Sequence, residues 1–213
     1  MKKLKISIAL NFLNIILETT GFIVRFILYG TRDLFKYYTR DSSLFLLIAT
    51  VIMFIFELLY YYKSKKISKW VYTLKYTAVG LTTLTFLTVL FVLGPQMSTY
   101  MGFGGAYGFL LLYGDCLFQH FLCPVVGFIS FVFFESEYKL TIIDSLIALI
   151  PTVIYSIIII ILVALNVVTP PYFFFDINSQ TVFMEIFWLA LLLGVIFGFY
   201  VLIRFINNKR VKE

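Results

Sequence analysis

Residues 140–167 read LTIIDSLIALIPTVIYSIIIIILVALNV, and this stretch decides the fold class. Asp144 is its only charged residue. An α-helix rises about 1.5 Å per residue, so about 20 apolar residues cross the roughly 30 Å hydrocarbon core of a bilayer. The stretch is therefore long enough and apolar enough to span a membrane as a helix.

The composition of the whole chain points the same way. Hydrophobic residues make up 62% of its 213 residues and charged residues only 13%. A soluble domain is roughly half apolar and about a quarter charged. The chain lacks the polar groups that would cover its apolar surface in water, so we predict an integral membrane protein.

Six stretches meet the length requirement for a span, and the joints between them carry glycine, proline or charge. The runs are long and continuous, unlike the alternating segments of about ten residues found in membrane β-barrels. We therefore predict an all-α polytopic protein with a single six-helix domain over residues 1–213. The predicted spans are residues 4–29, 43–62, 68–94, 108–134, 140–167 and 182–206.

Lysine and arginine gather at one set of span ends, namely before span one, between spans two and three, and after spans four and six. The positive-inside rule then places both termini in the cytoplasm. The net charge of +6 fits an anionic lipid surface and needs no nucleic-acid partner. We expect a multi-pass protein of the cell membrane, or of an internal membrane such as the endoplasmic reticulum in a eukaryote.

The first span carries a regular polar stripe. Asn11, Asn14, Glu18, Gly21 and Arg25 recur at spacings of three and four residues. This spacing places them on one helix face, which must point into the bundle because polar groups are costly in lipid. The stripe is either a hydrogen-bonded seam between helices or the wall of a polar cavity that binds a head group or orients a catalytic residue.

The other ionisable residues divide by depth. Glu57, Lys75 and Asp144 lie near the predicted cytoplasmic ends of their spans, where we expect ion pairs, or in the case of Lys75 a side chain that reaches the interface. Asp115 and Glu185 lie toward the outer side together with Arg25 and His120. The outer half is therefore where a reactive site would be assembled.

His120 is the only histidine, and it lies inside the fourth predicted span with Cys116 and Cys123 on the same helix face. It is either a satisfied structural residue or a general base, since histidine has the pKa for proton transfer. Metal binding is disfavoured because no second histidine exists and the cysteines lack CxxC spacing. We expect no metal and no cofactor.

A base needs a nucleophile, and Thr39 in the segment FKYYTRDSSLF (residues 35–45) is a candidate. It precedes span two on the outer side, where Asp41 or Ser42 is expected to cap the helix. Cys116 and Cys123 are alternative nucleophiles, although buried cysteine more often serves as packing. The uncharged segment of residues 94–109 is expected to form an interfacial loop.

Three segments together resemble a known family. KYYTRDSSLF opens span two, QHFLCPVVGFISFVFFE lies in span four, and PPYFFFDI precedes span six. Their order resembles the six-helix androgen-induced and ADTRP-like membrane hydrolases, which cleave fatty-acid esters of hydroxy fatty acids, and the bacterial relatives of this family. The resemblance implies a threonine nucleophile at Thr39 and a histidine base at His120.

The resemblance thus favours an intramembrane esterase that hydrolyses fatty-acyl esters of a membrane lipid. Glu18 or Asp115 would orient the imidazole, with Arg25, Asn14 and Glu185 along the cavity. Two alternatives stay open: a non-enzymatic carrier or lipid-binding protein with a polar intramembrane cavity, and a cysteine-dependent acyltransferase. The sequence indicates neither the substrate nor the oligomeric state.

Overall fold

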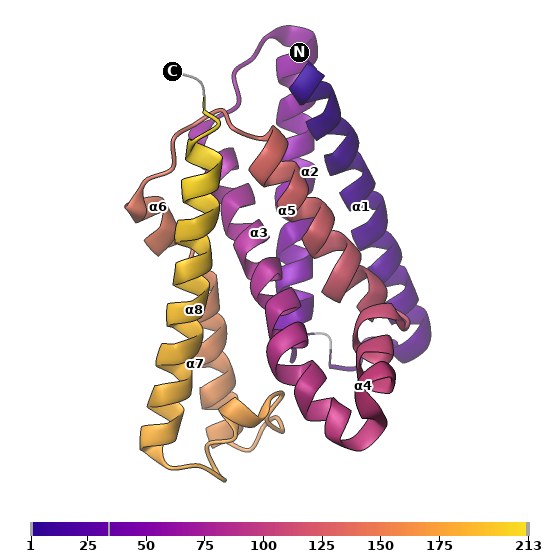
Figure 1. The fold of residues 1–213 in the computed structure, drawn as a ribbon, viewed down its shortest axis with the longest axis vertical. Coiled ribbons are helices and arrows are strands. Elements are labelled where there is room, and N and C mark those ends of the chain that lie inside the picture. Colours follow the sequence, from indigo (N-terminus) through magenta and orange to yellow (C-terminus); the bar gives the residue numbers. More distant parts are fainter. Residues whose placement is uncertain (1, 34, 212–213) are drawn as a thin grey trace.

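The computed structural model of the protein describes residues 2–33 and 35–211, and the regular structure in this part of the chain is entirely helical (Figure 1). In chain order the elements are α1 (Lys2–Tyr29), α2 (Tyr38–Lys63), α3 (Lys69–Thr88), the π-helical turn η1 (Val89–Leu93), α4 (Gly94–Leu112), the π-helical turn η2 (Leu117–Leu122), α5 (Cys123–Phe134), α6 (Ile142–Ile147), α7 (Ile150–Ala164), the 3-10 helix η3 (Phe173–Phe175) and α8 (Val182–Asn208).

Six helical segments are long and apolar enough to cross a membrane, which confirms the predicted helical, multi-pass class. The fourth is shorter than predicted, because residues 108–112 belong to α4 and the span begins at Leu117. The segments are Lys2–Tyr29, Tyr38–Lys63, Lys69–Leu112, Leu117–Phe134, Ile142–Ala164 and Val182–Asn208.

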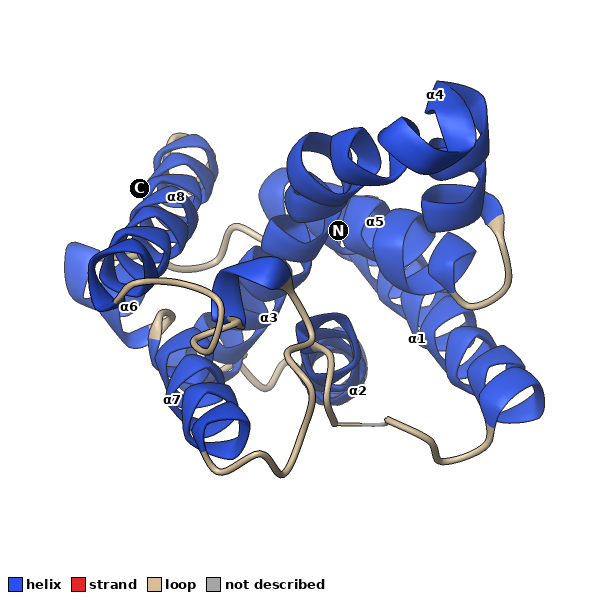
Figure 2. Cartoon of the chain, turned by 90° about the horizontal axis from the view of Figure 1, so that it is seen from below, coloured by secondary structure: helices blue, strands red, loops and turns tan. Residues whose placement is uncertain are grey.

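The helix α3 is the centre of the bundle. Figure 2 shows α2 on one side of it, α1 and α5 on another, and α7 with α8 on a third. Every residue of α3 from Lys75 to Thr85 is buried, whereas the buried residues of α8 are Ile196, Tyr200, Ile203 and Asn207. At Gly80 of α3 an added Cβ would lie 1.9 Å from the Tyr200 ring of α8, so these two helices approach as closely as a glycine permits.

The start of α1 and the end of α8 lie at the same end of the bundle, which we call the terminal end (Figure 1). The helix α4 lies at the opposite end. It is not the loop predicted over residues 94–109: it is helical on both sides of Gly102, whose φ of 70° bends the helix and leads the chain back toward α5. Glycine adopts this left-handed backbone without a Cβ clash.

The polar stripe of α1 faces the interior, as its spacing predicts. Asn11, Asn14 and Glu18 are fully buried and Arg25 is 3% exposed. Gly21 is also buried, and an added Cβ there would lie 2.8 Å from Phe118 in η2. The stripe therefore packs against the neighbouring helices over the length of α1.

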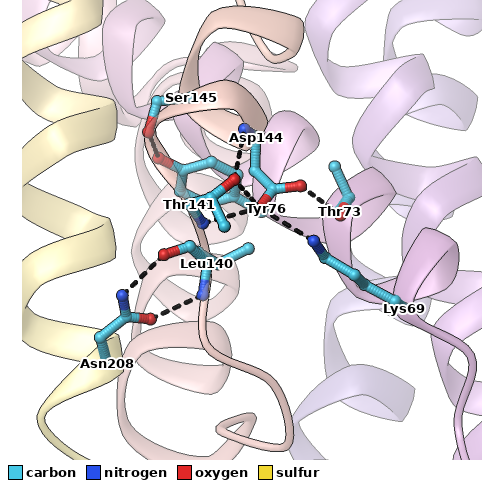
Figure 3. Close-up of polar contacts among 8 residues, drawn as sticks. All are labelled: Lys69, Thr73, Tyr76, Leu140, Thr141, Asp144, Ser145 and Asn208. Atoms are coloured by element: carbon cyan, nitrogen blue, oxygen red, sulfur yellow. Dashed lines mark hydrogen bonds and ion pairs between the residues drawn. The ribbon is translucent and has the colours of Figure 1, made fainter.

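Asp144 forms the ion pair expected of it. Its carboxylate lies 3.3 Å from Lys69 Nζ. It also accepts hydrogen bonds from the Thr141 backbone and hydroxyl, in a capping box that starts α6 (Figure 3). In the same view Asn208 of α8 bonds both backbone groups of Leu140. These contacts fasten the loop between α5 and α6 to α3 and α8.

Two expectations about local structure are wrong. Lys75 does not reach the interface: it is fully buried and donates to Asn11 Oδ1 at 3.0 Å and to Thr50 Oγ1 at 2.6 Å. Neither Asp41 nor Ser42 caps α2, because the helix starts earlier than predicted and its N-cap position is Tyr37, without a side-chain cap. As a result Thr39 lies within the first turn of α2.

Candidate functional site

The hydroxyl-bearing residue Thr39 is 9% exposed and lines a cavity of about 40 Å³ at the end opposite the termini. A single water needs about 10–15 Å³ of such volume, so the cavity accepts a small group such as an ester carbonyl. Residues from α2, α3, η1, α7, η3, α8 and the segment before η3 surround it. The start of α2 thus meets the α7–α8 side of the bundle at Thr39.

Neutral hydroxyls surround Thr39. Tyr38 and Thr152 are hydrogen-bonded at 2.8 Å, and Tyr155 donates to the Lys36 carbonyl at 2.8 Å. Tyr172, in the segment after α7, lies directly against Thr39. Burial raises the pKa of Tyr172 to about 12, while hydrogen bonds to Thr39 act in the opposite direction. The phenol is therefore neutral at physiological pH and can donate a hydrogen bond.

An apolar groove of about 270 Å³ adjoins this cavity. Leu84, Thr88, Phe174 and Leu192 line both spaces, so the groove and the Thr39 cavity lie on either side of these side chains. Its remaining lining is apolar and comes from α3, η1 and α8: Leu87, Phe91, Val92, Trp188, Leu191, Val195 and Phe199. A groove of this chemistry between membrane-spanning helices fits a hydrocarbon chain better than a polar molecule.

His120 lies in the π-helical turn η2, an element that is frequent at functional sites. Its Nδ1 lies 2.7 Å from the backbone carbonyl of Leu110 in α4. A carbonyl oxygen only accepts, so Nδ1 carries the proton and Nε2 keeps a free lone pair. The contact fixes the tautomer that a general base requires.

The structure does not bring His120 and Thr39 together as expected. His120 is not among the residues that line the Thr39 cavity, and no hydrogen bond joins the two side chains in the described part of the chain. Thr39 faces α3 and α7, whereas the imidazole is held toward α4. The two candidate catalytic groups therefore occupy neighbouring elements without a shared pocket.

Among the described residues, neither of the two expected orienting groups, Glu18 and Asp115, forms a hydrogen bond with the His120 imidazole. The Asp115 carboxylate lies 3.9 Å from Arg25 Nε, and the Arg25 guanidinium stacks on the Tyr29 ring at 4.2 Å. Glu18 lies beside Cys123 on α5, and both of its carboxylate oxygens are buried without a hydrogen-bond partner among the described residues. A backbone carbonyl, rather than a carboxylate, orients His120.

The remaining expected residues lie away from Thr39. The Asn14 amide packs against Gly127 of α5, where an added Cβ would lie 3.2 Å from its Nδ2. Glu185 lies in the first turn of α8 and does not line either the cavity or the groove.

Burial and the charge of Asp115 raise the pKa of the Cys116 thiol to about 12, which makes it a poor nucleophile.

Several residues around Thr39 were missed by sequence reasoning, among them Tyr155, Tyr172 and Thr85. Tyr172 belongs to the segment PPYFFFDI, which the sequence analysis used only as one of the three segments of the family resemblance. Groups of three or more His, Cys, Asp or Glu residues arranged to hold a metal ion are absent from residues 2–33 and 35–211. No family model, curated protein or solved structure matches the chain.

Proposed function

We propose that the protein is an intramembrane lipid esterase in which Thr39 is the nucleophile and His120 the base. The observation that carries the proposal is the position of the Thr39 residue, in the lining of a cavity that adjoins an apolar groove. The groove would hold an acyl chain, and the cavity would hold its ester carbonyl. The resemblance of the three sequence segments to the androgen-induced and ADTRP-like hydrolases supports the same assignment.

In the proposed reaction Thr39 Oγ1 attacks the carbonyl carbon and its proton passes to His120 Nε2. The tetrahedral intermediate collapses, the ester bond breaks, and the leaving alcohol takes the proton from the imidazole. Water then hydrolyses the acyl-threonine and releases the fatty acid. The Tyr172 phenol, next to Thr39, can donate to the developing oxyanion.

The proposal requires His120 to reach Thr39 when substrate is bound. Catalytic hydrogen bonds are often long in ligand-free enzymes and shorten only in the substrate complex. Such a change can come from η2 and the short turn before it, since the π-helical turn and the left-handed Gly114, with φ of 56°, make this segment irregular. With both termini in the cytoplasm, as the positions of lysine and arginine predict, Thr39 would lie in the outer leaflet.

A second function is favoured by the separation of Thr39 and His120: a lipid-binding or carrier protein that uses the same groove without chemistry. A turnover assay distinguishes the esterase from the carrier protein. Purified protein would be assayed with a fatty-acid ester of a hydroxy fatty acid, alongside Thr39→Ala, His120→Ala and Thr83→Ala. Thr83 on α3 is buried like Thr39 but lines neither the cavity nor the groove, so it is the matched control.

The esterase predicts a loss of kcat/KM of about a thousandfold or more for Thr39→Ala. It predicts a loss of about a hundredfold or more for His120→Ala and of less than about threefold for Thr83→Ala. Lipid binding without turnover by the unmodified protein would establish the carrier function instead. Loss of turnover only in a Cys116→Ser, Cys123→Ser variant would favour the acyltransferase.

A further inference from the structure

The largest cavity among those described lies at the terminal end, far along α2 from Thr39, and the esterase does not use it. It has a volume of about 560 Å³ and is bounded by the start of α1, the end of α2, the start of α3 and the end of α5. Pockets of 300–1,000 Å³ are typical of sites for small organic molecules. A bare metal ion would occupy only a small part of this space.

Two buried carboxylates form part of the cavity wall. Glu57 is 1% exposed and Glu135 is 3% exposed, and both line the cavity. The Asn11 amide nitrogen donates to Glu57 Oε2 and to Glu135 Oε1, each at 3.0 Å, so the two carboxylates lie close together. Like charges at this separation repel each other unless a positive charge lies between or beside them.

The described residues supply only part of the positive charge that would offset the Glu57 and Glu135 carboxylates. Lys75 is the buried cation of the cluster, and its ammonium bonds to Asn11 and Thr50 and forms no ion pair with either carboxylate. Ser7 donates to Glu57, and Ser130 donates to Glu135 Oε1 at 2.6 Å. Glu135 Oε2 is buried without a hydrogen-bond partner among the described residues. One lysine for two carboxylates leaves room for one further positive charge.

The mouth of the same cavity has the opposite charge. Lys2, Lys3 and Arg210 are exposed and line it, together with the single acidic residue Glu137. Aromatic side chains of Tyr60, Tyr61 and Phe134 also line the cavity. A basic mouth over an acidic, aromatic interior matches a molecule with a positive group at one end and a negative group at the other.

We propose that this cavity binds a phosphorylated amine, with its ammonium group on Glu57 and Glu135 and its phosphate at Arg210 and Lys3. Ammonium groups bind carboxylates and aromatic faces, and phosphate binds arginine and lysine. The same chemistry occurs in a free phosphoamine and in the head group of an amine-bearing phospholipid. Both sources reach the terminal end of the bundle, where membrane head groups meet water. The proposal is independent of Thr39.

The test is calorimetric titration of the purified full-length protein with O-phosphoethanolamine, with glycerol phosphate as the probe that lacks the amine. A parallel arm uses native mass spectrometry of the protein in micelles doped with phosphatidylethanolamine or phosphatidylglycerol. Binding of O-phosphoethanolamine identifies a free ligand. Retention of phosphatidylethanolamine alone identifies a lipid head group.

Two variants and a matched control locate the site. Glu135→Gln should weaken binding of the amine probe by about tenfold or more, since it removes the charge that faces the ammonium. Arg210→Gln, at an exposed position where folding is unaffected, should weaken binding about threefold to tenfold. Glu137→Gln removes a carboxylate at the mouth of the same cavity and should change affinity less than about twofold.

The proposal is overturned if neither amine probe binds more tightly than its amine-free counterpart. It is equally overturned if Glu137→Gln weakens binding as much as Glu135→Gln. If Glu135→Gln does not fold, as judged by circular dichroism and gel filtration, Arg210→Gln decides: unchanged affinity for O-phosphoethanolamine and phosphatidylethanolamine contradicts the site.

Discussion

At the terminal end of the bundle one asparagine, Asn11, bonds two buried carboxylates and a buried lysine, whereas at the opposite end Thr39 is surrounded by neutral hydroxyls. Buried charges are costly unless they are paired and hydrogen-bonded, so the first region fixes the positions of α1, α2, α3 and α5 relative to one another. Hydroxyls cost less to bury, and the second region keeps an unfilled cavity. We therefore assign the larger contribution to stability to the terminal end and the proposed reactivity to the opposite end of the same helices.

The largest effect expected from this comparison is that of Lys75→Met at the terminal end. Methionine has a similar volume but no charge, so Glu57 and Glu135 would lose their buried cation. Removing one partner from a buried charge cluster costs about 3–5 kcal/mol. The free energy of unfolding, measured by chemical denaturation in detergent, should fall by this amount.

The matched control is Lys69→Met, six residues earlier on α3. The Lys69 side chain is 49% exposed and pairs with Asp144. The Asp144 side chain is 8% exposed but keeps its hydrogen bonds from the Thr141 backbone and hydroxyl. Solvent screens the exposed lysine, so the pair contributes about 0–1 kcal/mol and this variant should remain close to the unmodified protein. Equal losses in the two lysine variants would contradict the structural role assigned to the buried charges.

A smaller effect comes from removing one hydroxyl at each end. Ser7→Ala deletes a donor to the buried Glu57 carboxylate and should destabilise the protein by about 1.5–3 kcal/mol. Thr39→Val keeps the shape of the side chain in a cavity that is already unfilled and should cost less than about 1 kcal/mol. The denaturation midpoints of the two variants provide the comparison. A larger loss of stability for Thr39→Val than for Ser7→Ala would contradict the assignment of stability to the terminal end.

The smallest effect concerns the pH dependence of the Cys116 thiol. Its raised pKa, about 12, keeps the thiol protonated at neutral pH, and the reactive thiolate forms only as the pH rises toward that value. In a Cys123→Ser background, alkylation at pH 8.5 should be at least about tenfold slower than in a short peptide that contains the same cysteine. A rate that levels off near pH 9 would show an ordinary thiol and restore the cysteine as a candidate nucleophile.

The sequence predicts the parts of this structure that depend on periodicity and hydropathy. The length of the apolar runs gives the six spans, and the spacing of Asn11, Asn14, Glu18 and Arg25 gives the buried face of α1. Both follow from the cost of placing polar groups in lipid, which acts residue by residue. Such local costs can be assessed without a tertiary structure.

The pairing of the polar groups could not be predicted in this way. Lys75 has the sequence position of a residue that reaches the interface, yet Asn11 and Thr50 from two other helices hold it in the interior. Glu135 follows the apolar run of α5 and looks like a joint between spans, whereas Asn11 and Ser130 bind it beside Glu57. These contacts depend on how the helices rotate against each other, which is a property of the whole bundle.

The assignment of Thr39 as the reactive residue is tested most directly by locating a covalent adduct. The purified protein would be treated with a long-chain fluorophosphonate, digested and sequenced by mass spectrometry. We expect the phosphonyl group on the Thr39 hydroxyl, with the adduct lost in both Thr39→Ala and His120→Ala. An adduct on another residue, or undiminished labelling in both variants, would contradict the assignment.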